Sequence, residues 1–192
     1  MLGKTLLILR CFAIICFIFL TAIAKPCLAE KEKPGFGILY PLISIDPEDL
    51  HGYRFSAFYQ PKPFIWKYFK LYVDTSYGRW FVDEIPYDYP AKRALSIVAI
   101  APVGRLYYKL TPSITPFIDI SVGLSYLSET RIYKRNLGMH FAFQDIGTIG
   151  ASFGPKENVS VSFGAMHYSN CSFSPRNSGI TMPLILSLGY RF

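Results

Sequence analysis

Apolar and polar residues alternate in short stretches along most of the chain. In the stretch from Ile118 to Tyr126, every second residue is aliphatic or aromatic, and the residues between them are Asp, Ser or Gly. Successive side chains of a β-strand point to opposite faces, so this period of two predicts a strand with one apolar and one polar face. Apolar residues at helical spacing are scarce, which indicates an all-β fold.

Eight such stretches are expected, and the connections between them alternate in length. The stretches cover residues 35–44, 52–59, 65–77, 96–109, 117–128, 140–153, 159–170 and 180–192. Short turns are expected at 60–63, 111–115 and 154–158, and longer connections at 45–51, 78–95, 129–139 and 171–179. Periplasmic turns and longer external loops alternate in this way in outer-membrane barrels. The pattern therefore predicts an eight-stranded antiparallel transmembrane β-barrel of the outer membrane. A soluble β-sandwich or lipocalin-like barrel would need a more polar outer face.

The polar face of these stretches would line the narrow interior of the barrel. Its charged residues are Arg54, Lys70, Asp74, Arg105, Asp119 and Arg191. A small closed barrel must fill and satisfy its interior, so we expect these charges to pair with one another. In the last stretch, unbroken alternation places Met182, Leu184, Leu186, Leu188 and Tyr190 on the apolar outer face.

The N-terminal segment has the layout of a secretory signal peptide. Lys4 and Arg10 precede an apolar run, and small residues follow before Glu30. We expect cleavage after Ala29, or alternatively after Ala24, which leaves residues 30–192 as the barrel domain. The alternative, an uncleaved membrane anchor, is disfavoured because the apolar run is short for a span.

Removal of residues 1–29 changes both the cysteine count and the charge. Of the four cysteines only Cys171 remains, so the exported chain cannot form an internal disulfide. The net charge falls from +7 to +4, because three basic residues and no acid leave with the signal. An exported chain of this charge is expected at the anionic surface of a Gram-negative outer membrane, not on nucleic acid.

The seventh stretch carries a histidine and a serine on its apolar face. Residues 159, 161, 163 and 165 are apolar, and the same parity continues to His167 and Ser169. The pair would therefore point outward, at the level of the outer leaflet. Polar groups facing lipid are costly, so this position suggests a function. The alternative is a solvated pair just above the membrane, or a hydroxyl bonded to backbone.

An adjacent imidazole and hydroxyl can carry out acyl transfer. The imidazole removes the hydroxyl proton, and the alkoxide attacks an ester carbonyl. The reaction also needs donors for the oxyanion, for which Asn170, Asn177 and the intervening loop are suitable. The ester-bearing molecule at this depth of the outer leaflet is the lipid A of lipopolysaccharide.

The stretch "HYSN", followed by "PRNSGI", resembles the C-terminal signature of the outer-membrane lipid A 3-O-deacylases, the PagL family. The Phe-Gln-Asp of "HFAFQDIGTIGASFG" is similar to the preceding strand of that family. The resemblance implies an eight-stranded barrel that hydrolyses the 3-linked 3-hydroxyacyl ester of lipid A without a metal or other cofactor. It further implies that His167 is the base, Ser169 the nucleophile and Asn177 an oxyanion donor, while Asn170 shapes the loop.

Two departures from the family pattern bear on activity. The family continues Ala-Gly after His-Tyr-Ser-Asn, whereas this chain has Cys171 and Ser172. Ser172 must then adopt the geometry of a glycine whose N–H faces the oxyanion, or the oxyanion hole differs. The family also has an acid shortly after the Asn-x-Gly step, where this chain reads Ile180-Thr181-Met182 and has no Asp or Glu after Glu157.

Asp145 is the candidate substitute for the missing acid. A hairpin through residues 154–158 that pairs Phe153 with Val159 sets Asp145 opposite His167, on the same outward face. We therefore expect Asp145 to orient the imidazole. The alternative is an acid at the membrane rim that bonds to backbone.

Three functions remain open from the sequence. The first is an esterase that removes the 3-linked acyl chain of lipid A, with lipopolysaccharide as its substrate and outer-membrane lipids around it. The second is a catalytically weak or inactive small barrel with a structural or adhesive role, which the missing acid favours. The third is another acyl-ester hydrolase such as a phospholipase. A homo-oligomer is compatible with each of the three.

Overall fold

The computed structural model describes residues 34–83 and 92–192. The expected signal peptide with its two cleavage points, and the middle of the connection expected at 78–95, lie outside the described residues. Within the described ranges there is no helix long and apolar enough to cross a membrane.

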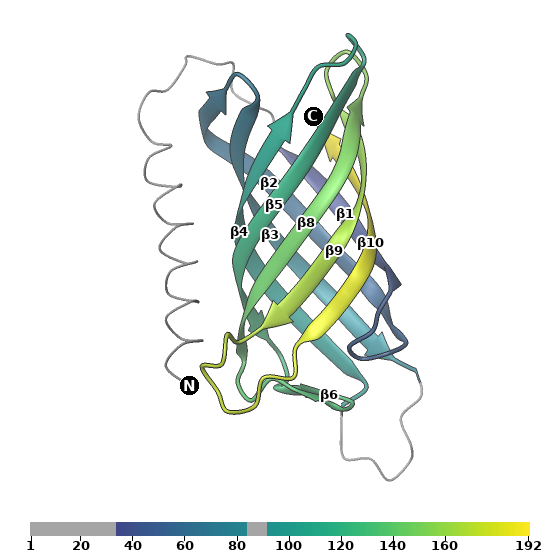
Figure 1. Ribbon diagram of the computed structural model, residues 1–192, viewed down its shortest axis with the longest axis vertical. Helices are drawn as coiled ribbons and strands as arrows, with labels where there is room; N and C mark the ends of the chain where they lie inside the picture. Colours follow the sequence, from purple (N-terminus) through teal and green to yellow (C-terminus); the bar gives the residue numbers. More distant parts are fainter. Residues whose placement is uncertain (1–33, 84–91) are drawn as a thin grey trace.

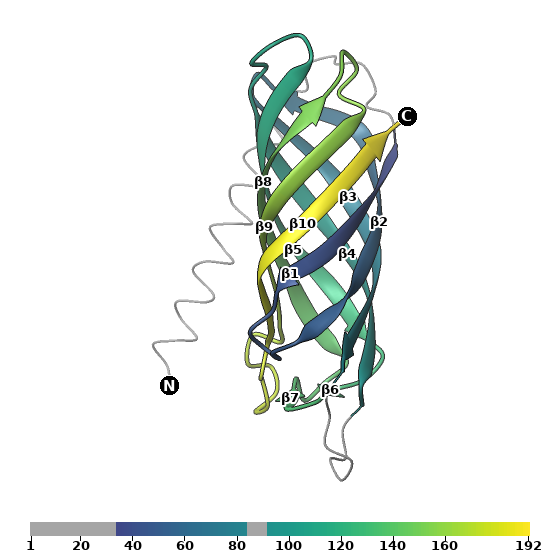
Figure 2. The same cartoon turned by 90° about the vertical axis from the view of Figure 1, so that its right-hand side faces the viewer.

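Eight strands form a closed antiparallel barrel, as the alternation predicted (Figure 1). They are β1 (Gly35–Ile43), β2 (Leu50–Trp66), β3 (Phe69–Val82), β4 (Ala94–Tyr107), β5 (Ile114–Leu127), β8 (Phe141–Phe153), β9 (Val159–Ser169) and β10 (Ile180–Arg191). Each strand pairs with its neighbour in the chain, and β1 closes the barrel against β10, beside which it lies in Figure 2.

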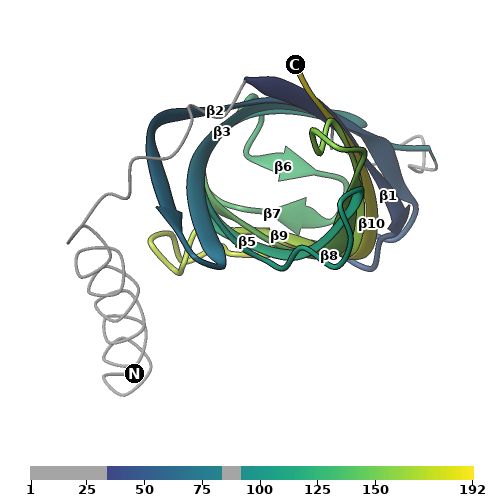
Figure 3. The same cartoon turned by 90° about the horizontal axis from the view of Figure 1, so that it is seen from above.

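The two ends of the barrel differ. The C-terminus and the short turns after β2, β4 and β8 lie at the upper end in Figure 1, and the longer connections lie at the lower end. A small hairpin of β6 (Arg131–Ile132) and β7 (Arg135–Asn136) belongs to the lower end. Seen along the barrel in Figure 3, this hairpin lies across the opening. We call the lower end the loop end and the upper end the turn end.

The turn expected at residues 60–63 is wrong, because these residues lie within β2. The pairing of β2 with β3 shifts register between Tyr59 and Phe64 and then continues to Trp66 opposite Phe69. A bulge accommodates Pro61 and Pro63, since proline cannot donate a ladder hydrogen bond and is tolerated at such irregularities. The chain reverses instead through Lys67 and Tyr68.

A bulge in β10 overturns the expected orientation of Met182. Met182 pairs with Met166 and Ile185 with Gly164, so two residues of β10 oppose one residue of β9. An extra residue in one strand reverses the parity beyond it. Met182 is therefore fully buried inside the barrel, and its neighbour Thr181 lies on the outer face with His167.

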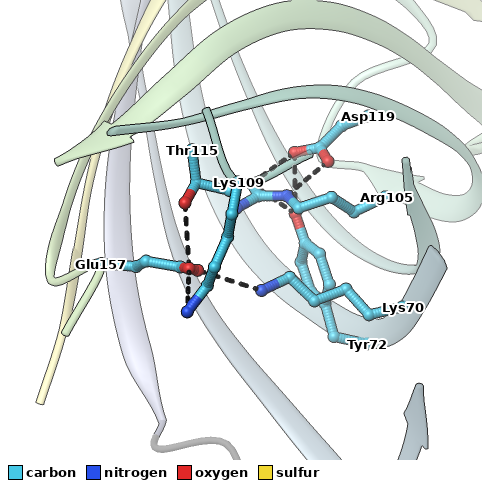
Figure 4. Close-up of polar contacts among 7 residues, drawn as sticks. All are labelled: Lys70, Tyr72, Arg105, Lys109, Thr115, Asp119 and Glu157. Atoms are coloured by element: carbon cyan, nitrogen blue, oxygen red, sulfur yellow. Dashed lines mark hydrogen bonds and ion pairs between the residues drawn. The ribbon is translucent and has the colours of Figure 1, made fainter. Parts of the chain in front are cut away.

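The interior has a polar layer toward the turn end. Arg105 donates to Asp119 through Nε (2.7 Å) and Nη2 (2.6 Å), and the Tyr72 hydroxyl donates to the same carboxylate (Figure 4). Glu157 accepts from Thr115 and pairs with Lys70 and Lys109. The remaining interior charges expected from the sequence have partners too: Arg54 pairs with Asp74, and the Arg191 guanidinium lies 5.0 Å from the Phe58 ring. The expected pairing of these charges with one another is confirmed for Arg54 with Asp74 and for Arg105 with Asp119, whereas Lys70 pairs with Glu157 and Arg191 lies against an aromatic ring.

An apolar cluster fills the loop end of the interior. It contains large side chains that are fully buried, among them Trp80, Leu95, Leu127 and Met182. Ile132 of β6 and Leu137, which directly follows β7, complete the cluster. The hairpin thus closes the barrel by hydrophobic burial.

The outer face is apolar across the strands. Its exposed side chains include Phe55, Ile100, Ile120, Leu124, Ile149 and Phe163. An exterior of this kind, around a polar and paired interior, is the surface of a barrel that spans a lipid bilayer.

Candidate active site

Three side chains form a row across neighbouring strands at the loop end of the outer face. Asp145 of β8 pairs with His167 of β9, and His167 pairs with Thr181 of β10. Directly opposed residues of antiparallel strands point to the same side, with Cβ atoms about 4.5–5.5 Å apart. The expected pairing of Phe153 with Val159 and of Asp145 with His167 is confirmed. Ser169 follows two residues after His167, on the same outward parity.

Thr181 makes the direct contact to the imidazole. Its Oγ1 lies 2.9 Å from Nδ1 of His167. Where Nδ1 carries the proton, Nδ1–H donates a hydrogen bond to the Thr181 hydroxyl, and Nε2 is left as the basic nitrogen. A hydroxyl can also donate to Nδ1, however, so Thr181 fixes the ring's position more firmly than its tautomer. Unbroken alternation turns Thr181 toward the interior, so the sequence pattern did not predict this contact, although Thr181 lies in the stretch where the family has its acid.

Asp145 flanks the imidazole without touching it. Within the described part of the chain, neither a hydrogen bond nor an ion pair joins its carboxylate to His167, although the two charges are close enough to interact. The orienting role expected for Asp145 stays a prediction, and the geometry limits it to an electrostatic one.

Gly179 packs directly against the imidazole. A Cβ atom at this position would lie 2.6 Å from Cε1 and 3.1 Å from Nε2 of His167. Real Cβ atoms do not approach so closely, so any side chain here would displace the ring. Gly179 therefore defines one wall of the site, and its lack of a side chain is a steric requirement.

Asn170 organises the loop of residues 170–179, which we call the catalytic loop. Asn170 is fully buried. Its Nδ2 donates to the carbonyls of Leu137 and Arg176, and its Oδ1 accepts from the N–H of Ser172 at 2.9 Å. Its own N–H donates to Oδ1 of Asn177 at 2.9 Å. The Asn177 amide is thereby held beside the peptide that follows Ser169.

The catalytic loop contains a left-handed turn. Cys171 and Ser172 have φ angles of 50° and 64°, and Phe173 N–H donates to the Asn170 carbonyl at 3.0 Å. This conformation favours glycine, so Ser172 does adopt a glycine-like geometry. Its N–H is nevertheless bound to Asn170, and it is not available to an oxyanion. Among the described residues, the Cys171 N–H and Nδ2 of Asn177 have no partner.

The Cys171 thiol lies close enough to the Ser169 hydroxyl for that hydroxyl to influence its pKa. Burial raises the pKa of the Cys171 thiol, the Ser169 hydroxyl opposes this change, and the Asp145 charge adds to it. A raised pKa keeps sulfur in the unreactive thiol form. Cys171 is therefore a weak competitor of Ser169 as nucleophile.

Three aromatic rings stand beside Ser169 on the outer face. Phe143 is directly opposite Ser169, Phe141 lies 5.0 Å from Phe143 between ring centroids, and Phe173 of the catalytic loop contacts both. Phe173 is 69% exposed. The hydroxyl thus lies at the edge of a surface suited to hydrocarbon. Residues 34–83 and 92–192 contain no cluster of three or more His, Cys, Asp or Glu that could hold a metal.

Comparisons with known proteins identify the family of this chain. The model of the family "Lipid A 3-O-deacylase (PagL)" matches residues 51–191. The lipid A deacylase PagL of Pseudomonas aeruginosa is 35% identical over 109 residues, which are 57% of this chain and 58% of that protein. The matched stretch thus spans less than two thirds of this relative.

A solved structure shares the fold. The crystal structure of the outer membrane enzyme PagL superposes with a TM-score of 0.63 and 24% identity, over 82% of this chain and 99% of that one. The family model covers most of the chain, including the strands that carry the histidine and serine and the loop between β9 and β10. The chain therefore belongs to the lipid A 3-O-deacylase (PagL) family of outer-membrane barrels.

Proposed function

We propose that this protein hydrolyses the ester of the 3-linked 3-hydroxyacyl chain of lipid A, with Ser169 as nucleophile and His167 as base. The observation that carries the proposal is the outward-facing histidine and serine, with Nδ1 of the imidazole held by Thr181. A dyad in this position meets an ester only in a lipid of the surrounding leaflet. The family match supports lipid A as that lipid.

The first half of the reaction acylates Ser169. Nε2 of His167 takes the hydroxyl proton, and Oγ bonds to the ester carbonyl carbon. The oxyanion accepts hydrogen bonds from Nδ2 of Asn177 and the Cys171 N–H, which have no partner among the described residues. When the tetrahedral intermediate collapses, the carbon–oxygen bond to the sugar breaks, and the imidazolium returns its proton to the sugar oxygen.

The second half releases the fatty acid. Water gives a proton to Nε2 and attacks the acyl carbonyl, and the departing Ser169 oxygen regains the proton from the imidazolium. The products are a 3-hydroxy fatty acid and lipid A with a free 3-hydroxyl. The Asp145 charge stabilises the imidazolium in both halves. The Phe141, Phe143 and Phe173 rings offer the acyl chain an apolar surface beside the nucleophile.

The Phe173 exposure and the family match favour this function over an adhesive barrel, and mass spectrometry tests it. Lipid A is extracted from cells of one Gram-negative host that carry the native gene, the Ser169→Ala gene or an empty vector. We expect the loss of one 3-hydroxyacyl chain from the 3-position with the native gene alone.

Two other results would overturn the proposal. Lipid A that stays intact beside lysophospholipids would indicate a phospholipase. Unchanged lipids in all three strains, with the barrel present and folded in the outer membrane, would indicate a protein with a structural or adhesive role. Heat modifiability on a gel shows whether the barrel is folded in each strain.

A further inference from the structure

Thr181 is itself held in place by a segment on the far side of β10. The connection between β1 and β2 runs beside Thr181. The Thr181 N–H donates to the Asp46 carbonyl at 2.9 Å, and the Thr181 carbonyl accepts from the Ile45 N–H at 3.2 Å. The Ser44 hydroxyl lies 3.3 Å from the same carbonyl. Both backbone polar groups of Thr181 are therefore engaged by residues 44–46, while its side chain contacts His167.

This segment is in turn tied to the β6–β7 hairpin. The Asp46 carboxylate forms an ion pair with Arg135 of β7, and both side chains are about one third exposed. The contacts thus form a continuous series from Arg135 through Asp46 and Thr181 to Nδ1 of His167. Each step joins a different element of the loop end.

The same hairpin also supports the other half of the site. The Asn136 carbonyl accepts from the Ser178 N–H at 3.0 Å, and the Leu137 carbonyl accepts from Nδ2 of Asn170. Gly138 packs so tightly on the catalytic loop that a Cβ atom there would lie 2.2 Å from the Ser174 hydroxyl. One short hairpin therefore contacts both the segment behind Thr181 and the loop that carries Asn177.

We propose that Asp46 and Arg135 are positioning residues for the imidazole, acting through Thr181. This inference rests on the proposed function for its kinetic consequence, but its structural content does not. Partly exposed ion pairs contribute little to stability. The Asp46–Arg135 ion pair matters because it fixes residues 44–46, whose backbone forms the hydrogen bonds that hold Thr181 in position. A small displacement of a catalytic group can reduce a rate by about 10²-fold.

The kinetic test compares Asp46→Asn and Arg135→Gln with a matched control. Glu129→Gln breaks the Lys92–Glu129 ion pair, which is also at the loop end but is more exposed, at 67% and 39%, and contacts no residue of the site. We expect kcat for lipid A in mixed micelles to fall by about tenfold to 10²-fold in the first two variants. KM should stay unchanged, and the control should match the native protein. Asp46→Glu and Arg135→Lys should restore part of the loss.

Coupling to Thr181 separates positioning from general support of the loops. In a Thr181→Val background the imidazole has lost its contact, so Asp46→Asn should cause little further loss. Additive losses in the double variant would overturn the proposal, as would a native kcat in both Asp46→Asn and Arg135→Gln.

A spectroscopic readout keeps the test independent of activity. The chain has three histidines, at positions 51, 140 and 167, so ¹⁵N spectra of the folded barrel in detergent resolve few imidazoles. His167→Gln assigns the signal. We expect Asp46→Asn and Arg135→Gln to shift the His167 ring nitrogens and leave those of His140 unchanged. Unchanged His167 nitrogens would refute the positioning role, even if the native protein proved inactive on lipid A. An inactive native protein with shifted nitrogens would instead refute the proposed function alone.

Discussion

Two groups of polar side chains lie within the height of this barrel, one inside and one outside. Inside, Arg105, Asp119 and Tyr72 form a closed set of hydrogen bonds, shielded from lipid by the barrel wall. Outside, His167 has one bonded nitrogen, and Asp145 lies near it without contact. Both groups contain ionisable residues, but only the outer one keeps a nitrogen and nearby N–H donors available for a substrate.

The difference shows how pairing distinguishes structural charge from reactive chemistry. A buried ion pair whose partners are fully satisfied fills space and fixes register, and it has nothing left to offer a ligand. An incomplete set on a lipid-facing surface is costly, so its persistence indicates a use.

Removal of the nucleophile should have the largest effect. Ser169→Ala removes the covalent route, and we expect hydrolysis of lipid A to fall by about 10⁴-fold or more, measured as release of 3-hydroxy fatty acid. Ser162→Ala is the matched control, because it makes the same change on the inward face of the same strand. Equal activity in Ser169→Ala and the native protein would exclude Ser169 as nucleophile.

Breaking the inner group should affect stability and spare the chemistry. Asp119→Asn leaves the buried Arg105 guanidinium without its counter-charge, which typically costs about 3–5 kcal/mol. Urea unfolding of the barrel in detergent, followed by tryptophan fluorescence, measures the loss, and kcat of the folded fraction should stay native. A native unfolding midpoint, or a selective loss of kcat, would contradict the division between the two groups.

Neutralising Asp145 should have an intermediate effect on activity. Asp145→Asn keeps the shape of the side chain and removes a charge that favours the imidazolium. Because this charge stabilises the imidazolium that forms in the reaction, we expect a fall in kcat of about tenfold to 10²-fold. The rate is measured as release of 3-hydroxy fatty acid from lipid A. An unchanged kcat would show that the dyad works without Asp145.

An acid at position 181 should raise activity modestly. A carboxylate can only accept from Nδ1, so it fixes the tautomer that the Thr181 hydroxyl leaves open. We expect Thr181→Glu to increase kcat by about tenfold and Thr181→Gln, which has the same size and no charge, to give no increase. A Thr181→Glu rate equal to that of the native protein would mean that Asp145 already supplies this function.

Relief of the left-handed turn should have the smallest effect. Glycine tolerates the φ angle of Ser172, and we expect Ser172→Gly to stabilise the barrel by about 1 kcal/mol in the same urea measurement. Ser174→Gly, a change of the same kind elsewhere in the catalytic loop, serves as control and should stabilise nothing. A destabilised Ser172→Gly variant would show that the serine side chain has a role of its own.

Much of the fold followed from alternation alone, because lipid outside and a polar lumen impose a strict period of two. The same rule located the outward parity of His167 and Ser169, and hairpin register located Asp145. It failed where the period was interrupted. Residues 60–63 looked like a turn because prolines usually end a strand, but here a bulge absorbs them.

The second failure concealed a residue of the site. Pro183 is compatible with a bulge, because proline cannot donate a ladder hydrogen bond, but it does not show that β10 holds an extra residue. Without the extra residue, the alternation sends Thr181 inward and Met182 outward. The contacts of Asp46 and Arg135 were equally hidden, since they depend on how three separate loops meet. Local pattern determines faces and registers, whereas bulges and loop contacts depend on the closed barrel.

The apolar cluster at the loop end has a consequence for permeability. The polar layer encloses a cavity of about 90 Å³, room for a few water molecules. Any ion moving along the axis would then have to shed its hydration to pass the packed side chains around Trp80 and Leu127. A barrel sealed in this way is an insulator. The outer membrane can therefore carry many copies of it without a gain in ion permeability, in contrast to the wider porin barrels, which enclose a water-filled channel.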